Sequence, residues 1–236
     1  MEGTEIRWRN SIIATGSRPA LPPVPGLADC DPLTSDTLWD LTELPGRLLV
    51  LGGGPVGCEL GQALSRLGSQ VTIVESQDRL LPGADPETSE LLAQQLRGEG
   101  VDIWLSTSAK SVEAATGGRV SLEAVSPQGR LGLDFDRVLS ATGRRPSSSG
   151  IGLDGLGVET EPDGAVLTDA RLRTSAPGLF AAGDVTGAMP HTHVAAYHAQ
   201  IATVNALFRT RRKVDYRAVP LVTFTDPEVA AVGMSE

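Results

Sequence analysis

Three glycines that follow a short apolar segment limit strongly what this part of the chain can fold into. Residues 48–75 read LLVLGGGPVGCELGQALSRLGSQVTIVE, in which Gly52, Gly54 and Gly57 have the spacing G-x-G-x-x-G. The first glycine permits a tight turn from strand to helix, the second lets backbone approach a pyrophosphate, and the third permits close packing of the helix on the strand. The pattern therefore predicts a strand, a glycine loop and a helix that bind a dinucleotide at the positive end of the helix dipole.

An acidic residue at the end of the second apolar run adds a second element of this prediction. Glu75 closes the run VTIVE, about 20 residues after the glycines, where a carboxylate can accept hydrogen bonds from ribose hydroxyls. The same carboxylate repels a 2′-phosphate, so we expect NADH to bind more tightly than NADPH. Arg79 lies close by in the sequence and complicates this preference, because an arginine can accommodate that phosphate.

A second set of glycines with the same spacing lacks this context. Gly150, Gly152 and Gly155 follow a run of serines, and no apolar pattern of helical period comes after them. We interpret this segment as a loop, because the dinucleotide fingerprint requires a strand before the glycines and a helix after them.

The composition is typical of a globular protein and disfavours some partners. Hydrophobic residues make up 40% of the 236 residues, and the formal net charge of -9 disfavours binding to nucleic acids or anionic membranes. No apolar run is long enough to span a membrane, and the opening residues lack the apolar core of a signal peptide. Cys30 and Cys58 are far apart and have the spacing of neither a metal site nor a redox pair. We therefore expect a cytoplasmic protein.

Sequence patterns elsewhere predict further helices and short strands. Asp85-Pro86-Glu87 is typical of a helix start with an Asp cap, and we expect this helix to run to about Glu99. Its buried face should include Leu91, Leu92 and Leu96, and another helix is expected at about 194–208. Strands are expected near 11–19, 101–105, 120–125, 137–141 and 179–182, the third of these in an antiparallel hairpin, and two more should be joined at 226–227.

Five motifs occur along the chain in a fixed order. They are ATGSRP at 14–19, GGGPVGCE at 52–59, VTIVE ending at 75, ATGRRP at 141–146 and LFAAGDV at 179–185. Together they resemble the flavoprotein disulfide reductases, the family of dihydrolipoamide dehydrogenase and mercuric reductase. VTFTDPEVAAVG, at 222–233, is similar to the start of that family's dimerisation domain. The segments THVAAYHA and FTDPEVAAVG resemble the mercuric-reductase-like branch of the family more than its other branches.

The resemblance implies an α/β fold in which a doubly wound, Rossmann-like NAD domain is inserted in a partial FAD domain of the same type. The start of an α+β interface domain would follow. On this basis we expect residues 1–41 to be an internal segment of the FAD-binding domain and 42–146 the NAD-binding domain. Residues 147–213 would be the C-terminal segment of the FAD-binding domain, and 214–236 the start of the dimerisation domain.

The resemblance also assigns residues to the two cofactors. Glu59 would be the catalytic-site residue near the nicotinamide and the reactive edge of the flavin. Asp184 would hydrogen-bond the ribityl chain, and the start of the following helix would lie beneath the flavin ring, where a helix N-terminus stabilises negative charge. The NAD contacts would be Gly52, Gly53, Gly54, Pro55, Val56, Gly57, Glu75, Val112 and Gly143. The FAD contacts would be Thr15, Gly16, Ser17, Asp184, Pro190, His191, Thr192 and His193.

Residue types alone leave alternatives for several of these positions. Asp184 could equally be a turn or cap residue, and Glu59 could be a solvated acid near the start of a helix, where the dipole favours it. His191 and His193 suggest a metal pair by type, yet no third ligand is visible, so we expect no metal site.

Three features of the family do not occur in this sequence. They are the first glycine fingerprint, for the FAD pyrophosphate, the redox-active CxxxxC, and the histidine-glutamate pair of the dimerisation domain. We therefore expect the chain to be the middle of a larger, homodimeric enzyme that passes hydride from NADH to FAD and on to a disulfide or metal-ion acceptor. The alternative is an NAD-binding module without this relay.

Overall fold

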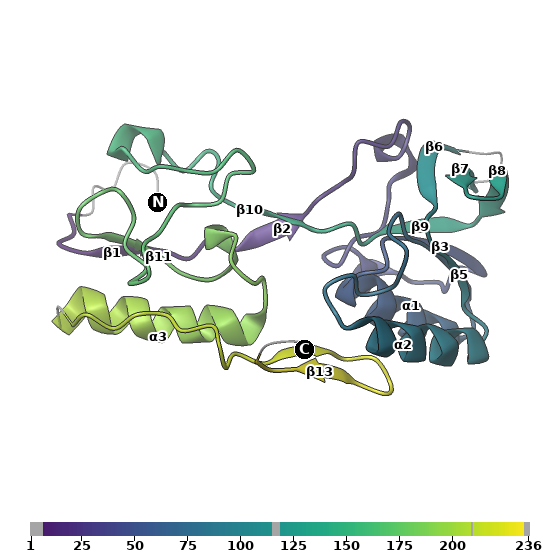
Figure 1. Ribbon diagram of the computed structural model, residues 1–236. Coiled ribbons are helices and arrows are strands. Elements are labelled where there is room, and N and C mark those ends of the chain that lie inside the picture. The colour runs from purple at the N-terminus through teal and green to yellow at the C-terminus, as the bar shows by residue number, and fades with distance from the viewer. Residues whose placement is uncertain (1–6, 115–118, 209, 234–236) are drawn as a thin grey trace. The chain divides into compact units, whose positions relative to one another are not determined.

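Two stretches of chain that are distant in sequence make up each unit of this fold (Figure 1). The computed structural model describes residues 7–114, 119–208 and 210–233. Unit 1 combines residues 1–18 with 144–219, and unit 2 combines residues 19–143 with 220–236. Residues 19–41 thus group with the glycine loop, whereas we expected them with residues 1–18. The reason lies in backbone contacts such as the bond from the Leu33 amide to the Val138 carbonyl, at 2.8 Å.

A four-stranded parallel sheet forms the centre of unit 2. Its strand order is β5-β4-β3-β9, and every neighbouring pair is parallel. Both faces of such a sheet are covered, so its strands are apolar in continuous runs rather than in alternation. The last four residues of β3 and of β4 are accordingly all buried. The strands are β3 (Arg47–Leu51), β4 (Gln70–Val74), β5 (Asp102–Trp104) and β9 (Arg137–Ser140).

The two faces of this sheet are covered by different structures. Leu48 and Val50 of β3 belong to a core cluster with residues of two helices, α1 (Pro55–Leu67) and α2 (Pro86–Gly98). Leu49 and Leu51 point the other way, into a core with the antiparallel sheet β6-β7-β8. That sheet confirms the predicted hairpin and consists of β6 (Ser108–Ala114), β7 (Val120–Ser126) and β8 (Gly129–Phe135).

Helix α2 begins and ends where the sequence predicts, but two details were wrong. The N-cap residue Asp85 makes no side-chain hydrogen bond to the helix, so its role is not that of a hydrogen-bonding cap. Leu91 is 67% exposed, whereas Leu92 and Leu96 are buried as expected. At 100° per residue the buried positions form one stripe with Ser89 and Ala93, and Leu91 lies on the opposite side.

Unit 1 is organised around two short parallel strands and one long helix. β1 (Ser11–Ile13) pairs with β11 (Leu179–Ala181), and α3 (Thr192–Phe208) contacts both strands. The chain passes between the units at β2 (Ser17–Pro19) and β10 (Arg144–Pro146), which pair with each other. In the part of the chain that the structure describes, no helix is long and apolar enough to cross a lipid bilayer.

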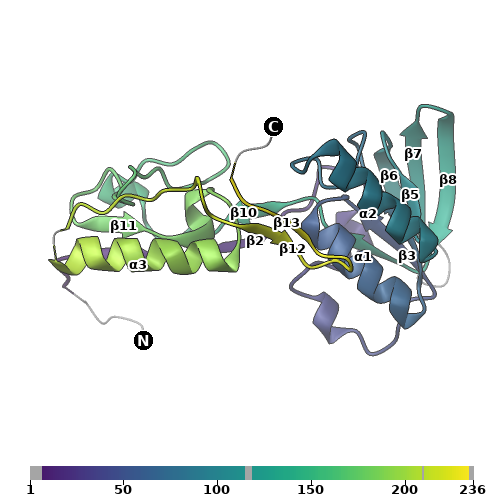
Figure 2. The same ribbon diagram turned by 60° about the horizontal axis from the view of Figure 1, so that its bottom comes forward.

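The last described strands complete unit 2 rather than stand apart from it. β12 (Leu221–Thr223) and β13 (Val229–Ala231) form the antiparallel pair predicted around Asp226-Pro227. β12 contacts α1, and Figure 2 shows the hairpin in yellow beside that helix. Short 3-10 helices complete the list of elements: η1 (Ala28–Cys30), η2 (Leu38–Asp40), η3 (Asp154–Leu156) and η4 (Gly183–Thr186).

Close packing of the glycine loop excludes side chains at two of its positions. A Cβ on Gly57 would collide with the carbonyl oxygen of Gly52, and a Cβ on Gly52 would lie 2.5 Å from the carbonyl oxygen of Ala141. Gly52 also has a φ of 104°, which favours glycine. Gly54 differs, because nothing lies within 4 Å of its Cβ position. The loop is therefore closed toward the sheet and open at Gly54.

These two environments predict that the same substitution destabilises the protein to different extents. Gly57→Ala should lower the free energy of unfolding by about 1–3 kcal/mol, because α1 must move away from β3 to admit the methyl group. Gly54→Ala is the matched control and should change it by less than about 1 kcal/mol. Urea unfolding followed by circular dichroism measures both. Equal stability of the two variants would show that the contact between Gly57 and Gly52 does not constrain the helix.

Candidate functional site

The carboxylate of Glu75 lies against the glycine loop. Glu75 follows β4 directly and is 7% exposed. Its Oε2 accepts a 2.6 Å hydrogen bond from the Gly53 amide. Its Oε1 accepts bonds from the Gln77 amide at 2.7 Å and from the Ser76 hydroxyl at 3.1 Å. The acid predicted to contact a ribose is thus fixed beside the loop predicted to bind the pyrophosphate.

The start of α1 supplies donors for an anion next to this carboxylate. The first intrahelical bond runs from the Cys58 amide to the Gly54 carbonyl, at 3.0 Å. The amides of Val56 and Gly57 precede it and have no acceptor within the helix, while Pro55 at the first helical position has no N–H. Together with the open position at Gly54, this donor set fits the pyrophosphate of a dinucleotide.

The thiol of Cys58 is not reactive in these surroundings. Burial, together with the nearby carboxylates of Glu75 and Glu59, raises its pKa to about 12. Its Sγ donates to the Gly53 carbonyl at 3.3 Å. Burial also raises the pKa of Cys30, the other free cysteine. Since the thiolate is the nucleophile, neither thiol is activated at neutral pH.

Arg79 is engaged by the residue before it. Its Nε lies 2.9 Å from Oδ1 of Asp78, and its Nη2 lies 3.2 Å from Oδ2, so the guanidinium and the carboxylate form a bidentate pair. The hydrogen bonds from Arg79 lower the pKa of Asp78. The guanidinium of Arg79 is therefore directed toward Asp78 rather than toward Glu75.

Glu59 lies on α1 in an environment that the sequence did not reveal. Its Oε1 accepts a 2.8 Å hydrogen bond from the amide of Phe224, which directly follows β12. The carboxylate is therefore held by the hairpin at the end of unit 2. Its predicted position near a nicotinamide stays a prediction.

Two other residues assigned to NAD have contrasting surroundings. Gly143 is exposed, has a φ of 122°, and accepts a bond from the Ala20 amide at 3.0 Å. Val112 is 0% exposed and packs in the core with Leu49. Its amide donates to the Pro25 carbonyl at 2.9 Å. Its side chain thus lies inside the protein, and its contact with NAD stays a prediction.

In unit 1, the residues assigned to FAD include a connected polar group. Oδ2 of Asp184, in η4, accepts a 2.7 Å bond from the Ser17 hydroxyl. Arg144 donates to the same hydroxyl at 2.7 Å and to the Ser17 carbonyl at 2.9 Å. Sequence reasoning missed Arg144, although its motif, ATGRRP, was noted. The neighbouring Gly16 has a φ of 69° and accepts a bond from the Ser147 amide.

The other residues assigned to FAD lie at the start of α3. Thr192 is its first residue, and Pro190 and His191 precede it. The rings of His191 and His193 have centroids 5.4 Å apart. Within the described residues, no group of three or more His, Cys, Asp or Glu side chains could hold a metal ion.

The sequence profile of the pyridine nucleotide-disulphide oxidoreductases matches residues 1–199. The chain belongs to this family. It is 39% identical to a mercuric reductase from Staphylococcus aureus over 236 residues, which are 100% of the chain and 43% of that relative. It is 36% identical to a dihydrolipoyl dehydrogenase from Bacillus subtilis over 231 residues, 97% of the chain and 48% of that relative.

A solved structure extends this family relationship to the fold. The HOCl-induced flavoprotein disulfide reductase RclA from Escherichia coli superposes with a TM-score of 0.85 and 32% sequence identity. The match covers 95% of this chain and 51% of that one. This member of the family therefore spans about half the length of the relatives it matches, and it has their α/β fold.

One further residue, which sequence reasoning missed, holds η4, the short helix that contains Asp184. His198 is 0% exposed, and its Nδ1 accepts a 3.2 Å bond from the amide of Gly183, the first residue of η4. Its Nε2 lies 2.7 Å from the hydroxyl of Tyr216. An acceptor at Nδ1 requires the neutral ring with its proton on Nε2. Burial lowers the pKa of His198, which favours this neutral form.

The lowered pKa of His198 predicts a pH-dependent stability. The unfolded chain, in which the pKa returns to about 6.5, takes up a proton that the folded chain does not. The free energy of unfolding should therefore fall as the pH decreases below about 6.5, whereas above it this group adds no slope. Urea unfolding at pH ~5.5 and ~7.5 measures the difference. His198→Gln keeps an acceptor for Gly183 but does not titrate, and an unchanged pH dependence in this variant would overturn the assignment.

Proposed function

We propose that this chain is the cofactor-binding part of an FAD-dependent oxidoreductase of the disulfide-reductase type, in which hydride passes from NADH to FAD and on to a disulfide or a metal ion. Family membership supports this reaction class. The observation that carries the NADH assignment is the 2.6 Å bond between Glu75 and the Gly53 amide, which joins the acid to the glycine loop. Unit 2 would then bind NAD, and unit 1 would bind FAD.

In unit 2, the pyrophosphate and the ribose of a bound dinucleotide would each meet a suitable group. The amides of Val56 and Gly57 and the dipole of α1 bind the pyrophosphate at the open side of Gly54. Glu75 would accept a hydrogen bond from a ribose hydroxyl, because a carboxylate has about four acceptor sites and Gly53, Ser76 and Gln77 use three of them. Glu59 lies further along the same helix and would face the nicotinamide.

In unit 1, a carboxylate and a helix start would serve the flavin. Asp184 would accept a hydrogen bond from a hydroxyl of the ribityl chain, while Ser17, which Arg144 holds, keeps its carboxylate in place. The first amides of α3 favour negative charge on the ring system. When both cofactors are bound, NADH supplies a hydride and FAD accepts it.

The surroundings of Glu75 also support a preference for NADH over NADPH. A buried carboxylate held by amides cannot move away from a 2′-phosphate, so the two negative charges repel each other. Arg79, which could neutralise that phosphate, is held by Asp78. Both features act in the same direction.

This preference can be measured by titrating the chain with NADH and NADPH and following nucleotide fluorescence. We expect NADH to bind at least ~10-fold more tightly than NADPH. Glu75→Ala should weaken NADH binding and reduce the preference, because it removes both the ribose acceptor and the repulsion. Asp78→Ala should strengthen NADPH binding alone, because it releases Arg79. Tighter binding of NADPH to the unaltered chain would refute the proposed preference.

The complete protein would act on a small-molecule or metal-ion acceptor. We propose that it is a cytoplasmic homodimer, with neither nucleic acid nor a membrane as a partner. The net charge of -9 supports the last point, because it disfavours binding to polyanionic surfaces.

A second candidate function is an NAD-binding module without electron transfer to thiols. It needs only the dinucleotide site of unit 2, and the two cysteines are consistent with it, because the pKa of Cys58 is raised to about 12 and burial raises that of Cys30. Neither thiol of this sequence is therefore suited to relay electrons from a flavin.

The visible absorption spectrum of the chain separates these two functions. The purified chain is mixed with FAD, freed of unbound cofactor, and titrated with NADH in the absence of oxygen. A retained flavin band that bleaches on addition of NADH is the result expected of the oxidoreductase. Asp184→Ala should lose the band, because the ribityl contact is removed. No retained flavin, together with intact NADH binding, would favour the binding module.

A further inference from the structure

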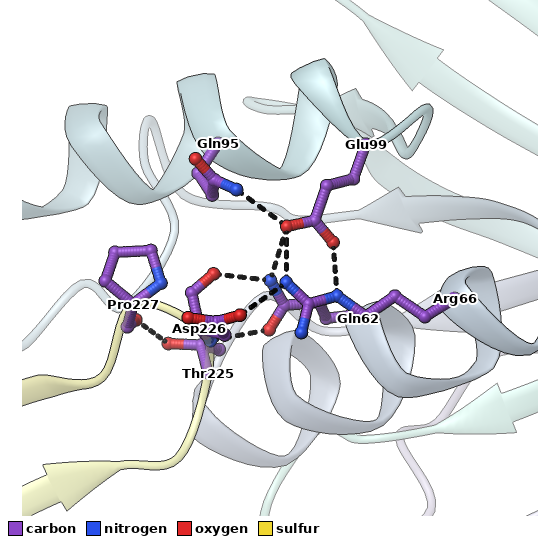
Figure 3. Close-up of polar contacts among 7 residues, drawn as sticks. All are labelled: Gln62, Arg66, Gln95, Glu99, Thr225, Asp226 and Pro227. Carbon is purple, nitrogen blue, oxygen red and sulfur yellow. Dashed lines mark hydrogen bonds and ion pairs between the residues drawn. The ribbon is translucent and has the colours of Figure 1, made fainter.

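One face of α1 holds a segment from the end of unit 2 (Figure 3). We call this segment, residues 224–227, the strap. Glu59, Gln62 and Arg66 contact it. Their spacing of three and four residues places all three side chains on the same side of the helix. The strap therefore lies along α1, the helix that begins at the glycine loop.

Gln62 binds the backbone of the strap with both ends of its amide group. Its Oε1 accepts a bond from the Asp226 amide, and its Nε2 donates to the Asp226 carbonyl, each at 2.8 Å. Nε2 also donates to Oε1 of Glu99 at 3.1 Å. The Gln62 side chain is 3% exposed, so removing it would leave these backbone groups without their buried partner.

Arg66 adds charge to this arrangement. Its Nη2 lies 2.9 Å from Oδ2 of Asp226, and its guanidinium also makes two 2.7 Å bonds to the carboxylate of Glu99. These bonds hold the pKa of Glu99 at about 2, so the carboxylate stays ionised at neutral pH. Gln95 donates to Glu99 at 2.7 Å but makes no bond to the strap that Figure 3 draws.

The strap in turn holds Glu59. The Phe224 amide donates to Oε1 of Glu59 at 2.8 Å, two residues before the position that Gln62 fixes. A bond within the strap, from the Thr225 hydroxyl to the Pro227 carbonyl at 2.9 Å, restricts its own shape. Because the strap is restrained, the Phe224 amide limits the Glu59 side chain to those conformers in which its carboxylate can accept this hydrogen bond.

We propose that Gln62 and Arg66 are positioning residues, which fix the strap on α1 so that the Phe224 amide orients the carboxylate of Glu59 toward the nicotinamide. This inference rests on the proposed function. One helix would then set both ends of the cofactor, since its first turn binds the pyrophosphate and its lateral face sets the group beside the nicotinamide. Loss of the strap should weaken contacts with the nicotinamide alone.

Two ligands that differ at the nicotinamide end test whether the strap positions Glu59. ADP-ribose has the adenosine, the pyrophosphate and the second ribose of NADH but lacks the nicotinamide. Gln62→Met keeps the volume of the side chain and removes its bonds to the strap. It should weaken NADH binding by roughly 3- to 10-fold, the effect of losing about one hydrogen bond, and leave ADP-ribose binding unchanged.

Hydrogen exchange gives an independent measure of the strap. The Phe224 amide should exchange at least ~10-fold faster in Gln62→Met than in the unaltered chain, while amides of β3 and β4 keep their rates. Gln95→Met is the control, because it disturbs Glu99 without touching the strap. Arg66→Gln changes an exposed residue and should shift both readouts in the same direction, which keeps the test available if Gln62→Met does not fold.

The outcomes separate this inference from the proposed function. Equal weakening of NADH and ADP-ribose, or faster exchange at Phe224 with unchanged NADH binding, would show that the strap has a structural role only and would overturn the inference. Unaltered exchange at Phe224 would also overturn it. If the unaltered chain binds neither nucleotide, the proposed NADH function fails, and with it the role of the strap at the nicotinamide.

Discussion

The contact between Gly57 and Gly52 determines where α1 can lie, and most of unit 2 depends on that position. A helix that carried a side chain at Gly57 would be displaced from β3 by the carbonyl oxygen of Gly52. The first turn of the helix so placed follows the open position at Gly54, and its lateral face contacts the strap. The free amides, Glu59 and Gln62 therefore follow one another along the axis of α1.

Both candidate cofactor sites restrain a carboxylate before any ligand is bound. Glu75 is fixed by the amides of Gly53 and Gln77, and Asp184 is fixed by Ser17. A side chain that is already ordered loses less conformational entropy when it binds a hydroxyl, so more of the interaction energy contributes to affinity. The two units differ in their donors, since Glu75 is held by two backbone amides and one hydroxyl, whereas Asp184 is held by a side chain.

The sequence predicted those parts of the fold that depend on local spacing. The glycine spacing predicted the turn from β3 to α1, and Glu75 was expected at the end of the second strand, where it follows β4. The exposure of Leu91 could have been predicted from helical period, because that residue lies opposite the stripe formed by Leu92 and Leu96.

Contacts between distant segments could not be predicted in this way. Gln62 and Asp226 are 164 residues apart, and no local pattern indicates that an amide side chain will bind that backbone. His198 was equally hidden, because the type of residue within an apolar helix does not indicate from which backbone amide it will accept a hydrogen bond. Arg144 lies within a motif that was recognised, yet its bond to Ser17 depends on the pairing of β2 with β10.

The division of unit 2 into two stretches also has a consequence for the order of events during synthesis. Residues 19–143 contain the whole parallel sheet, but the buried amide of Gln62 meets its backbone partners only in residues 220–236. A ribosome makes the chain from the N-terminus, so the entire second stretch of unit 1 is synthesised in between. Until Asp226 emerges, Gln62 lacks both of its bonds to the strap, although its bond to Glu99 lies within the first stretch, and α1 reaches its final environment only after that point.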